Sequence, residues 1–168
     1  APGRVPAGSV CREMASTMDM LPTFARLGGS KVPTDRVIDG HDVADLVHGV
    51  IGAKSPTKAL FHYVHTHLQA VRSGKWKLHV SRPANPRWTP NWARHIDAKD
   101  VFDIASPLLY DLDADVGETT DVAATHPDVV RRLLGFVEGG RADIGDYDRI
   151  GAGARFFDDD PRRPDIGK

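Results

Sequence analysis

The sequence predicts an α+β fold, in which a small four-stranded antiparallel sheet is packed by a C-terminal helix. Four short strand-like segments follow one another at hairpin-like spacing, and an amphipathic segment begins at Pro127. The third strand-like segment alternates strictly, with Trp76, Leu78 and Val80 against Lys75, Lys77 and His79. Period two is typical of an antiparallel strand with one buried face and one solvated face.

The first element is a short helix over residues 17–28. A hydroxyl of Ser16 or Thr17 can cap its first turn, and Gly28-Gly29 can end it in the left-handed conformation. One apolar stripe recurs at helical spacing, formed by Met20, Leu21, Phe24 and Leu27. Because the helix is short and one-sided, we expect this stripe to pack against a partner surface.

The predicted strands cover Ala59–Val64, Leu68–Arg72, residues 75–80 and Leu108–Leu112, with a tight turn at Ser73-Gly74. Beyond them, the last helix covers Pro127–Glu138 and has the apolar width to cover the dry face of the sheet.

The last helix also carries start and stop signals. Thr125 and Asp128 have the spacing of a capping box, and Gly139-Gly140 can end the helix. Beyond it we expect an irregular tail over residues 141–168.

Composition excludes several classes of function. The chain has 168 residues, 40% of them hydrophobic and 27% charged, with a formal net charge of −1. This balance lacks the basic excess of a general nucleic-acid binder. No apolar run approaches the roughly 20 residues of a membrane helix. The single cysteine, Cys11, excludes an internal disulfide framework.

Two histidines form the first candidate site. On a strand, His65 and His67 project from the same face and could share a metal ion with a third ligand, whereas His62 points the other way. No Cys or Glu stands at ligand spacing beside them. A polar role at the edge of a cleft is therefore the favoured interpretation.

The stretch 81–107 is the second candidate site, because prolines exclude a long regular element there. Tryptophan rings stack on sugars or aromatic ligands, and the arginine fork matches sulfate or phosphate oxygens. An anion-and-ring platform could thus form from Trp88 and Trp92 with Arg87 and Arg94, in a stretch that also holds His95. The alternative, which we weight more heavily, is that the tryptophans are buried lids over the sheet edge.

The acidic stretch Asp111, Asp113, Asp115, Glu118 could suggest calcium, but it lacks the EF-hand pattern. We expect a solvated turn whose carboxylates accept hydrogen bonds from backbone amides.

Four motifs in order resemble the sulfatase family. Residues 18–24 resemble its hDLLPTh helix, and Asp39-Gly40 its hDGhDh turn. Residues 69–78, QAVRSGKWKL, are similar to the hRxGKWKh hairpin, and residues 108–118 to the LYDLxxDPGExxNh strand and turn. Val116 stands where that turn usually has Pro, and Asp121 where it usually has Asn.

The resemblance covers only the C-terminal part of the family, whose members have a large α/β catalytic domain before a smaller antiparallel sheet. It implies that residues 1–54 are a remnant or linker of the missing catalytic domain, including the helix at 17–28. Residues 55–140 would be the C-terminal subdomain. Without its partner domain, we expect the chain to self-associate through this helix.

The resemblance further implies a sulfuric ester hydrolase acting on sulfate esters. Its nucleophile comes from a C-x-P-x-R motif, which the residues after Cys11 do not match. Calcium is implied for the full-length family, but no ligand, cofactor or catalytic residue is implied here. The segment would support the catalytic domain, be inactive alone, and wall the substrate cleft with His65, His67, Arg87, Trp88, Trp92 and His95. A stand-alone binding module for sulfated or phosphorylated glycans is the alternative. The full-length protein could be periplasmic or secreted, which the sequence does not decide.

Overall fold

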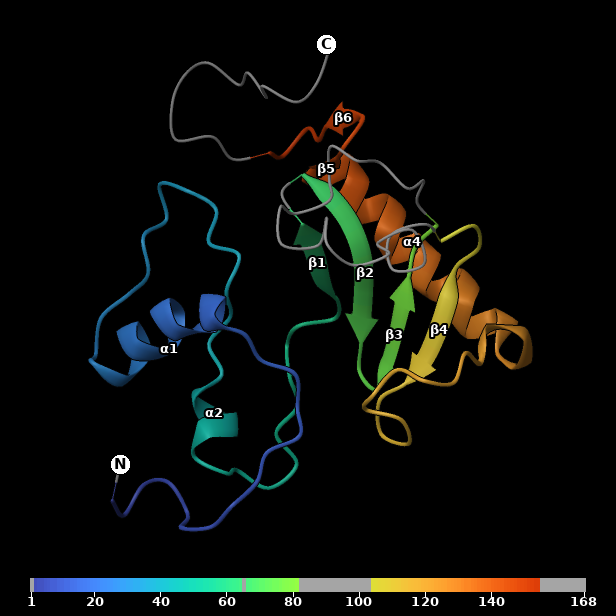
Figure 1. Cartoon of the computed structure of the whole chain (residues 1–168). Coiled ribbons are helices and arrows are strands. Elements are labelled where there is room, and N and C mark those ends of the chain that lie inside the picture. Colours follow the sequence, from blue (N-terminus) through green and yellow to red (C-terminus); the bar gives the residue numbers. More distant parts are fainter. Residues whose placement is uncertain (1, 65, 82–103, 155–168) are drawn as a thin grey trace, which may run out of the picture. The chain divides into compact units, whose positions relative to one another are not determined.

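The computed structural model describes residues 2–64, 66–81 and 104–154 (Figure 1). The chain forms two compact units, residues 1–58 and residues 59–168. Within the described ranges, no helix has both the length and the apolar character that crossing a bilayer requires.

An antiparallel four-stranded sheet forms the centre of the second unit, as the sequence predicts. Its strands follow the chain in the order β1 (Leu60–Val64), β2 (His67–Ser73), β3 (Trp76–His79) and β4 (Leu108–Asp111). Gly74 has a φ of +58° in the turn between β2 and β3, a left-handed conformation that favours glycine. An irregularity after His62 shifts the register between β1 and β2.

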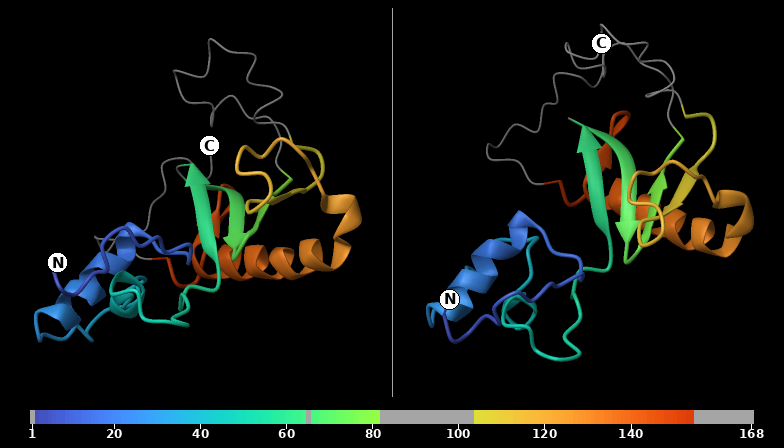
Figure 2. Two further views of the ribbon diagram at one scale, coloured as in Figure 1. Left: turned by 90° about the horizontal axis from the view of Figure 1, so that it is seen from below. Right: turned by 60° about the horizontal axis from the view of Figure 1, so that its bottom comes forward.

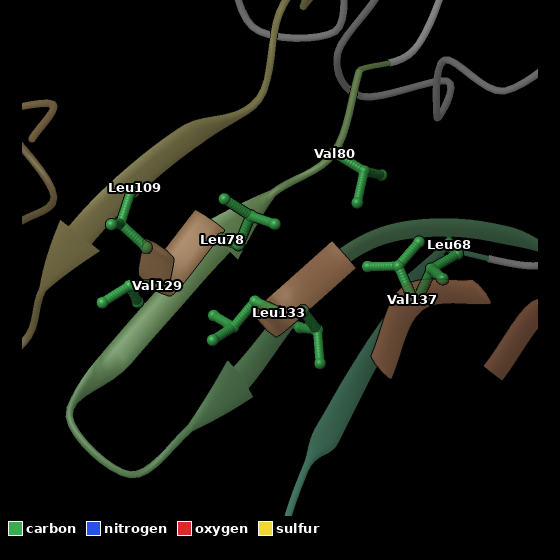
Figure 3. Packing of buried hydrophobic residues seen from close by; sticks show 8 residues of the cluster. Leu68, Leu78, Val80, Leu109, Val129, Leu133 and Val137 are labelled. Atoms are coloured by element: carbon green, nitrogen blue, oxygen red, sulfur yellow. The ribbon is translucent and has the colours of Figure 1, made fainter. Parts of the chain in front are cut away.

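One face of this sheet is covered by helix α4 (Pro127–Asp143), which lies along it in the views of Figure 1 and Figure 2. The cross-strand row Phe61, Val71, Leu78, Leu109 faces the helix. Figure 3 shows Leu133 and Val137 of α4 packed among the sheet side chains. Each fully buried Leu or Val contributes roughly 1.5–3 kcal/mol of hydrophobic stabilisation. The predicted alternation in β3 is therefore confirmed.

The start of α4 differs from the sequence prediction. The expected capping box is wrong, because the Thr125 hydroxyl donates to the carbonyl of Val122 within the short 3₁₀ turn η3 (Ala123–Thr125). His126 is the N-cap instead, and Pro127 occupies the first helical turn, where no amide is needed.

The end of α4 also differs. The helix continues through Gly139-Gly140 to Asp143, so the expected end at this glycine pair is wrong. Gly140 lies against the ring of Phe61, where a Cβ would clash. Beyond it, β5 (Gly145–Asp146) and β6 (Arg149–Ile150) form a hairpin. The tail is thus regular up to residue 150.

The first unit contains η1 (Thr17–Asp19), α1 (Met20–Leu27) and the short α2 (Ala44–Val47). Two polar side chains at the start of α1 hold the segment 40–43 by its backbone. The buried carboxylate of Asp19 accepts hydrogen bonds from the amides of Ser16 and His41, at 2.7 and 2.8 Å. The hydroxyl of Thr23 accepts one from the amide of Val43 at 3.0 Å. Gly40 passes so close to the carbonyl of Met18 that a Cβ would lie 1.9 Å from it.

Candidate functional site

Of the six predicted substrate-contacting residues, the structure describes His67. The others, His65, Arg87, Trp88, Trp92 and His95, lie outside the described residues. His67 begins β2 and is 3% exposed, so it is a buried residue at the end of the sheet. Its ring packs on that of Tyr147, with centroids 4.8 Å apart.

A buried carboxylate lies beside His67 and fixes this end of β2. Asp146, 1% exposed, accepts hydrogen bonds from the backbone amides of Leu68 and Tyr147, at 3.0 and 2.8 Å. The guanidinium of Arg141 donates to its second oxygen at 2.8 Å. Burial alone would lower the pKa of Arg141, but its hydrogen bonds to carboxylates raise it, so this arginine stays charged.

The hydroxyl of Tyr63 donates to the carbonyl of Gly145 at 2.8 Å, which ties β1 to the same place. We name this group the hairpin cluster: Tyr63, His67, Arg141, Asp146 and Tyr147. It fixes the β5–β6 hairpin to the strand ends that flank residue 65. The sequence signal was weak, because one Asp in a Gly- and Arg-rich tail looks like a solvated residue.

A second polar group lies on the face of the sheet opposite α4. Lys77 donates to one oxygen of the Glu118 carboxylate at 2.5 Å, and the Nε2 of His79 lies 2.6 Å from the other. Because a carboxylate only accepts hydrogen bonds, the His79 nitrogen is the donor. We name these three residues the sheet-face cluster. Their side chains are 19–25% exposed, so the expected wet face of β3 is partly covered.

Backbone strain accompanies this contact, since Glu118 has a φ of +55°, the left-handed region that non-glycine residues seldom adopt. Burial would raise the pKa of the Glu118 carboxyl. The hydrogen bonds from Lys77 and His79 outweigh burial and hold that pKa below its usual value. The carboxylate is therefore a charged clamp between the loop and β3.

Asp115 accepts hydrogen bonds from backbone amides, as the sequence predicts, and so does Asp121 just beyond the acidic stretch. One oxygen of Asp115 accepts from the amides of Thr119 and Thr120, at 2.7 and 2.8 Å. Asp121 accepts from the amides of Leu109 and Ala123, both at 2.9 Å. Both amides bind one oxygen, Oδ1, and an Asn side chain also has an acceptor oxygen at this position.

Calcium does not fit these residues, because their oxygens already serve as caps. Within the part of the chain that the structure describes, no three His, Cys, Asp or Glu side chains are grouped to hold a metal ion.

Comparison with known proteins gives a consistent result. The sequence profile described as the C-terminal region of aryl-sulfatase matches residues 55–153. Human arylsulfatase D is 39% identical over 131 residues, which are 70% of this chain and 21% of that protein. An arylsulfatase of Hemicentrotus pulcherrimus is 32% identical over 152 residues, which are 82% of this chain and 27% of that protein.

The fold agrees with these relatives. The crystal structure of PsFucS1 sulfatase from Pseudoalteromonas sp. superimposes with a TM-score of 0.64 at 23% identity, covering 83% of this chain and 28% of that one. The chain thus spans about a fifth to a quarter of the length of the relatives that it matches.

Proposed function

The chain belongs to the arylsulfatase family, through the family's C-terminal region, and we propose that it supports the α/β catalytic domain of a sulfuric ester hydrolase. The profile match over residues 55–153 carries this proposal. The motif order adds to it, since all four resemblances fall between residues 18 and 122. The substrate class is a sulfate ester.

On its own, this polypeptide is expected to be inactive. The formylglycine nucleophile of the family comes from a C-x-P-x-R motif, and Cys11 is followed by Arg-Glu-Met-Ala. Cys11 is also exposed, without the buried surroundings of a catalytic centre. Calcium would be held by the catalytic domain of the longer protein.

An apolar surface on α1 supports a partner domain. Met20, Leu21, Phe24 and Leu27 are all exposed, Phe24 to 64%. Contiguous exposed apolar side chains of this kind mark an interaction surface. We assign this stripe to contact with the α/β domain, and to self-association when that domain is absent.

The end of β2 that carries His67 is proposed to wall the substrate cleft. The hairpin cluster holds this end rigidly, which suits a residue that positions a substrate-facing loop. His65, Arg87, Trp88, Trp92 and His95 remain part of this proposal. The alternative of a stand-alone glycan-binding module is not favoured by the family match.

The test of inactivity is a chromogenic aryl-sulfate assay on purified residues 1–168, beside a Cys11→Ala variant. We expect both proteins to show only background hydrolysis. Turnover by the wild-type chain that the Cys11→Ala variant loses would refute the proposal, because the nucleophile would then lie in this segment.

The test of the stripe is sedimentation over a range of concentrations. We expect the wild-type chain to associate, and a Leu21→Glu, Phe24→Glu variant to remain monomeric. Val116→Glu is the matched control, since Val116 is 87% exposed and lies outside the stripe. A wild-type chain that stays monomeric throughout would contradict the assignment.

A further inference from the structure

On the face of the sheet opposite α4, the described residues include four basic side chains and one carboxylate, Glu118, that pairs with two of them. Strand register places His62, Ala70 and His79 in one cross-strand row. The neighbouring row holds Arg72 directly opposite Lys77. Side chains in register share a face of a sheet, so these four basic residues surround the small Ala70.

Two of these groups have unused hydrogen-bonding capacity. Arg72 donates through Nε to the carbonyl of Gly74 at 3.0 Å, its one hydrogen bond among the described residues. Four of its five N–H donors therefore have no acceptor among residues 2–64, 66–81 and 104–154. The Nε2 of His62 is buried and has no partner within the described ranges. A buried polar atom without a partner is costly, which points to an absent ligand.

The charges on this face are unbalanced as well. Like charges directly opposite in a sheet, as Arg72 and Lys77 are, destabilise it. The Glu118 carboxylate pairs with Lys77 and His79, but in the described part of the chain no carboxylate forms an ion pair with Arg72. Tyr110, next to Lys77 in the same row, is neutral, since burial and nearby carboxylates raise its pKa.

We propose that Arg72 and His62, with Lys77 beside them, form a binding site for a tetrahedral oxyanion on this face of the sheet. The planar fork of Arg72 matches two oxygens of a sulfate or phosphate group. The imidazole of His62 supplies a further donor once it is protonated, and the positive charge of Lys77 adds to the attraction. This site does not depend on the proposed support of a catalytic domain.

The charges around His62 make its pKa a specific indicator of anion binding at this site. Burial, followed by the positive charge of Lys77, lowers the pKa of His62 in the free protein. An anion bound between His62 and Arg72 would favour the imidazolium and raise this pKa. His126, which packs on Trp76 at the α4 side, should not respond.

The experiment is an NMR titration of the imidazole resonances of residues 1–168 with sodium sulfate, against sodium chloride at equal ionic strength. We expect sulfate to raise the His62 pKa saturably and to leave that of His126 unchanged. Arg72→Gln should weaken sulfate binding about tenfold or more, because a charged hydrogen bond contributes about 1.5–3 kcal/mol. Arg72→Lys, which keeps the charge but lacks the fork, should bind with intermediate strength.

Arg131→Gln is the matched control, since Arg131 is an exposed arginine on α4. A parallel titration with phenyl sulfate compares a sulfate ester with the free sulfate ion. Saturable binding of either ligand supports the proposed site, and the tighter one identifies the preferred form of the anion. The proposal is overturned if sulfate moves His62 no more than His126, or if Arg72→Gln binds sulfate as the Arg131→Gln variant does.

Discussion

Removing the carboxylate of Asp146 should destabilise the second unit more than any other single polar truncation that we propose. The Asp146→Ala change removes the acceptor of the Leu68 and Tyr147 amides and the buried one of the two carboxylates that bind Arg141, the other being the exposed Glu138. The Arg141 side chain is only 22% exposed, so water compensates poorly. Truncating one member of a buried ion pair costs about 3–5 kcal/mol, and we expect a loss in this range.

The measurement is urea and thermal unfolding followed by far-UV circular dichroism. For a domain of this size, 3–5 kcal/mol corresponds to a fall in Tm of about 6–20 °C. Asp146→Asn keeps an acceptor oxygen but loses the charge, so its cost should be about half as large. Asp148→Ala is the control, because its side chain is 43% exposed and its pair with Arg149 lies at the surface.

The reasoning fails if Asp146→Ala is as stable as Asp148→Ala, because the buried contacts would then contribute nothing. It also fails if Asp146→Asn costs as much as Asp146→Ala. In that case the charge, and not the pair of amide contacts, would account for the whole effect.

Three further outcomes follow from single contacts. Gly140→Ala should lower the free energy of unfolding in urea by about 1–3 kcal/mol, because its Cβ would lie 2.7 Å from the Phe61 ring. Gly135→Ala is the control: its Cβ would meet open space, so it should stabilise α4 by up to about 1 kcal/mol. Asp121→Asn should unfold at the same urea concentration as the wild type and Asp121→Ala at a lower one, since the site needs only an acceptor. Glu118→Gln should be less stable than the wild type at neutral pH. The pKa of Glu118 is lower in the folded state than in the unfolded chain, where it is about 4.3. The stability difference between the two proteins is therefore lost as the pH falls from about 4.3 through the folded-state pKa. A difference at pH 3 equal to that at neutral pH would contradict the role of Glu118 as a charged clamp.

Local pattern was sufficient to predict the sheet and the helix that covers it. Alternation along residues 75–80 is a backbone property of a strand, so the burial of Leu78 and Val80 could be predicted without knowing their partners. The amphipathic width of α4 likewise predicts a helix on one face of a sheet. Resemblance to a family then gave the domain type independently.

Contacts between distant segments could not be predicted in this way. The β5–β6 hairpin is held by Asp146, whose partner Leu68 lies 78 residues earlier in the chain. The glycine at position 140, inside α4, is explained by the Phe61 ring of β1 that lies against it. Glycine pairs usually end helices, but here the lack of a side chain allows the helix to approach the sheet closely.

The residues of the candidate site could also not be predicted from local sequence. Of the predicted residues, His67 was expected at a cleft edge as an accessible polar group, and the structure buries it against Tyr147. The sequence assigned no site to Arg72, which belongs to the hairpin motif of residues 69–78, or to His62, which was expected to point away from His65 and His67. Only the strand register brings them to one face.

The family motifs themselves turn out to mark contacts that hold the chain together. Asp19 and Thr23 of the first motif accept hydrogen bonds from the backbone of the second, across about 20 residues of sequence. Lys77 of the third motif pairs with Glu118 of the fourth. Because these motif residues bind residues of another motif, the joint presence of the motifs predicts the fold.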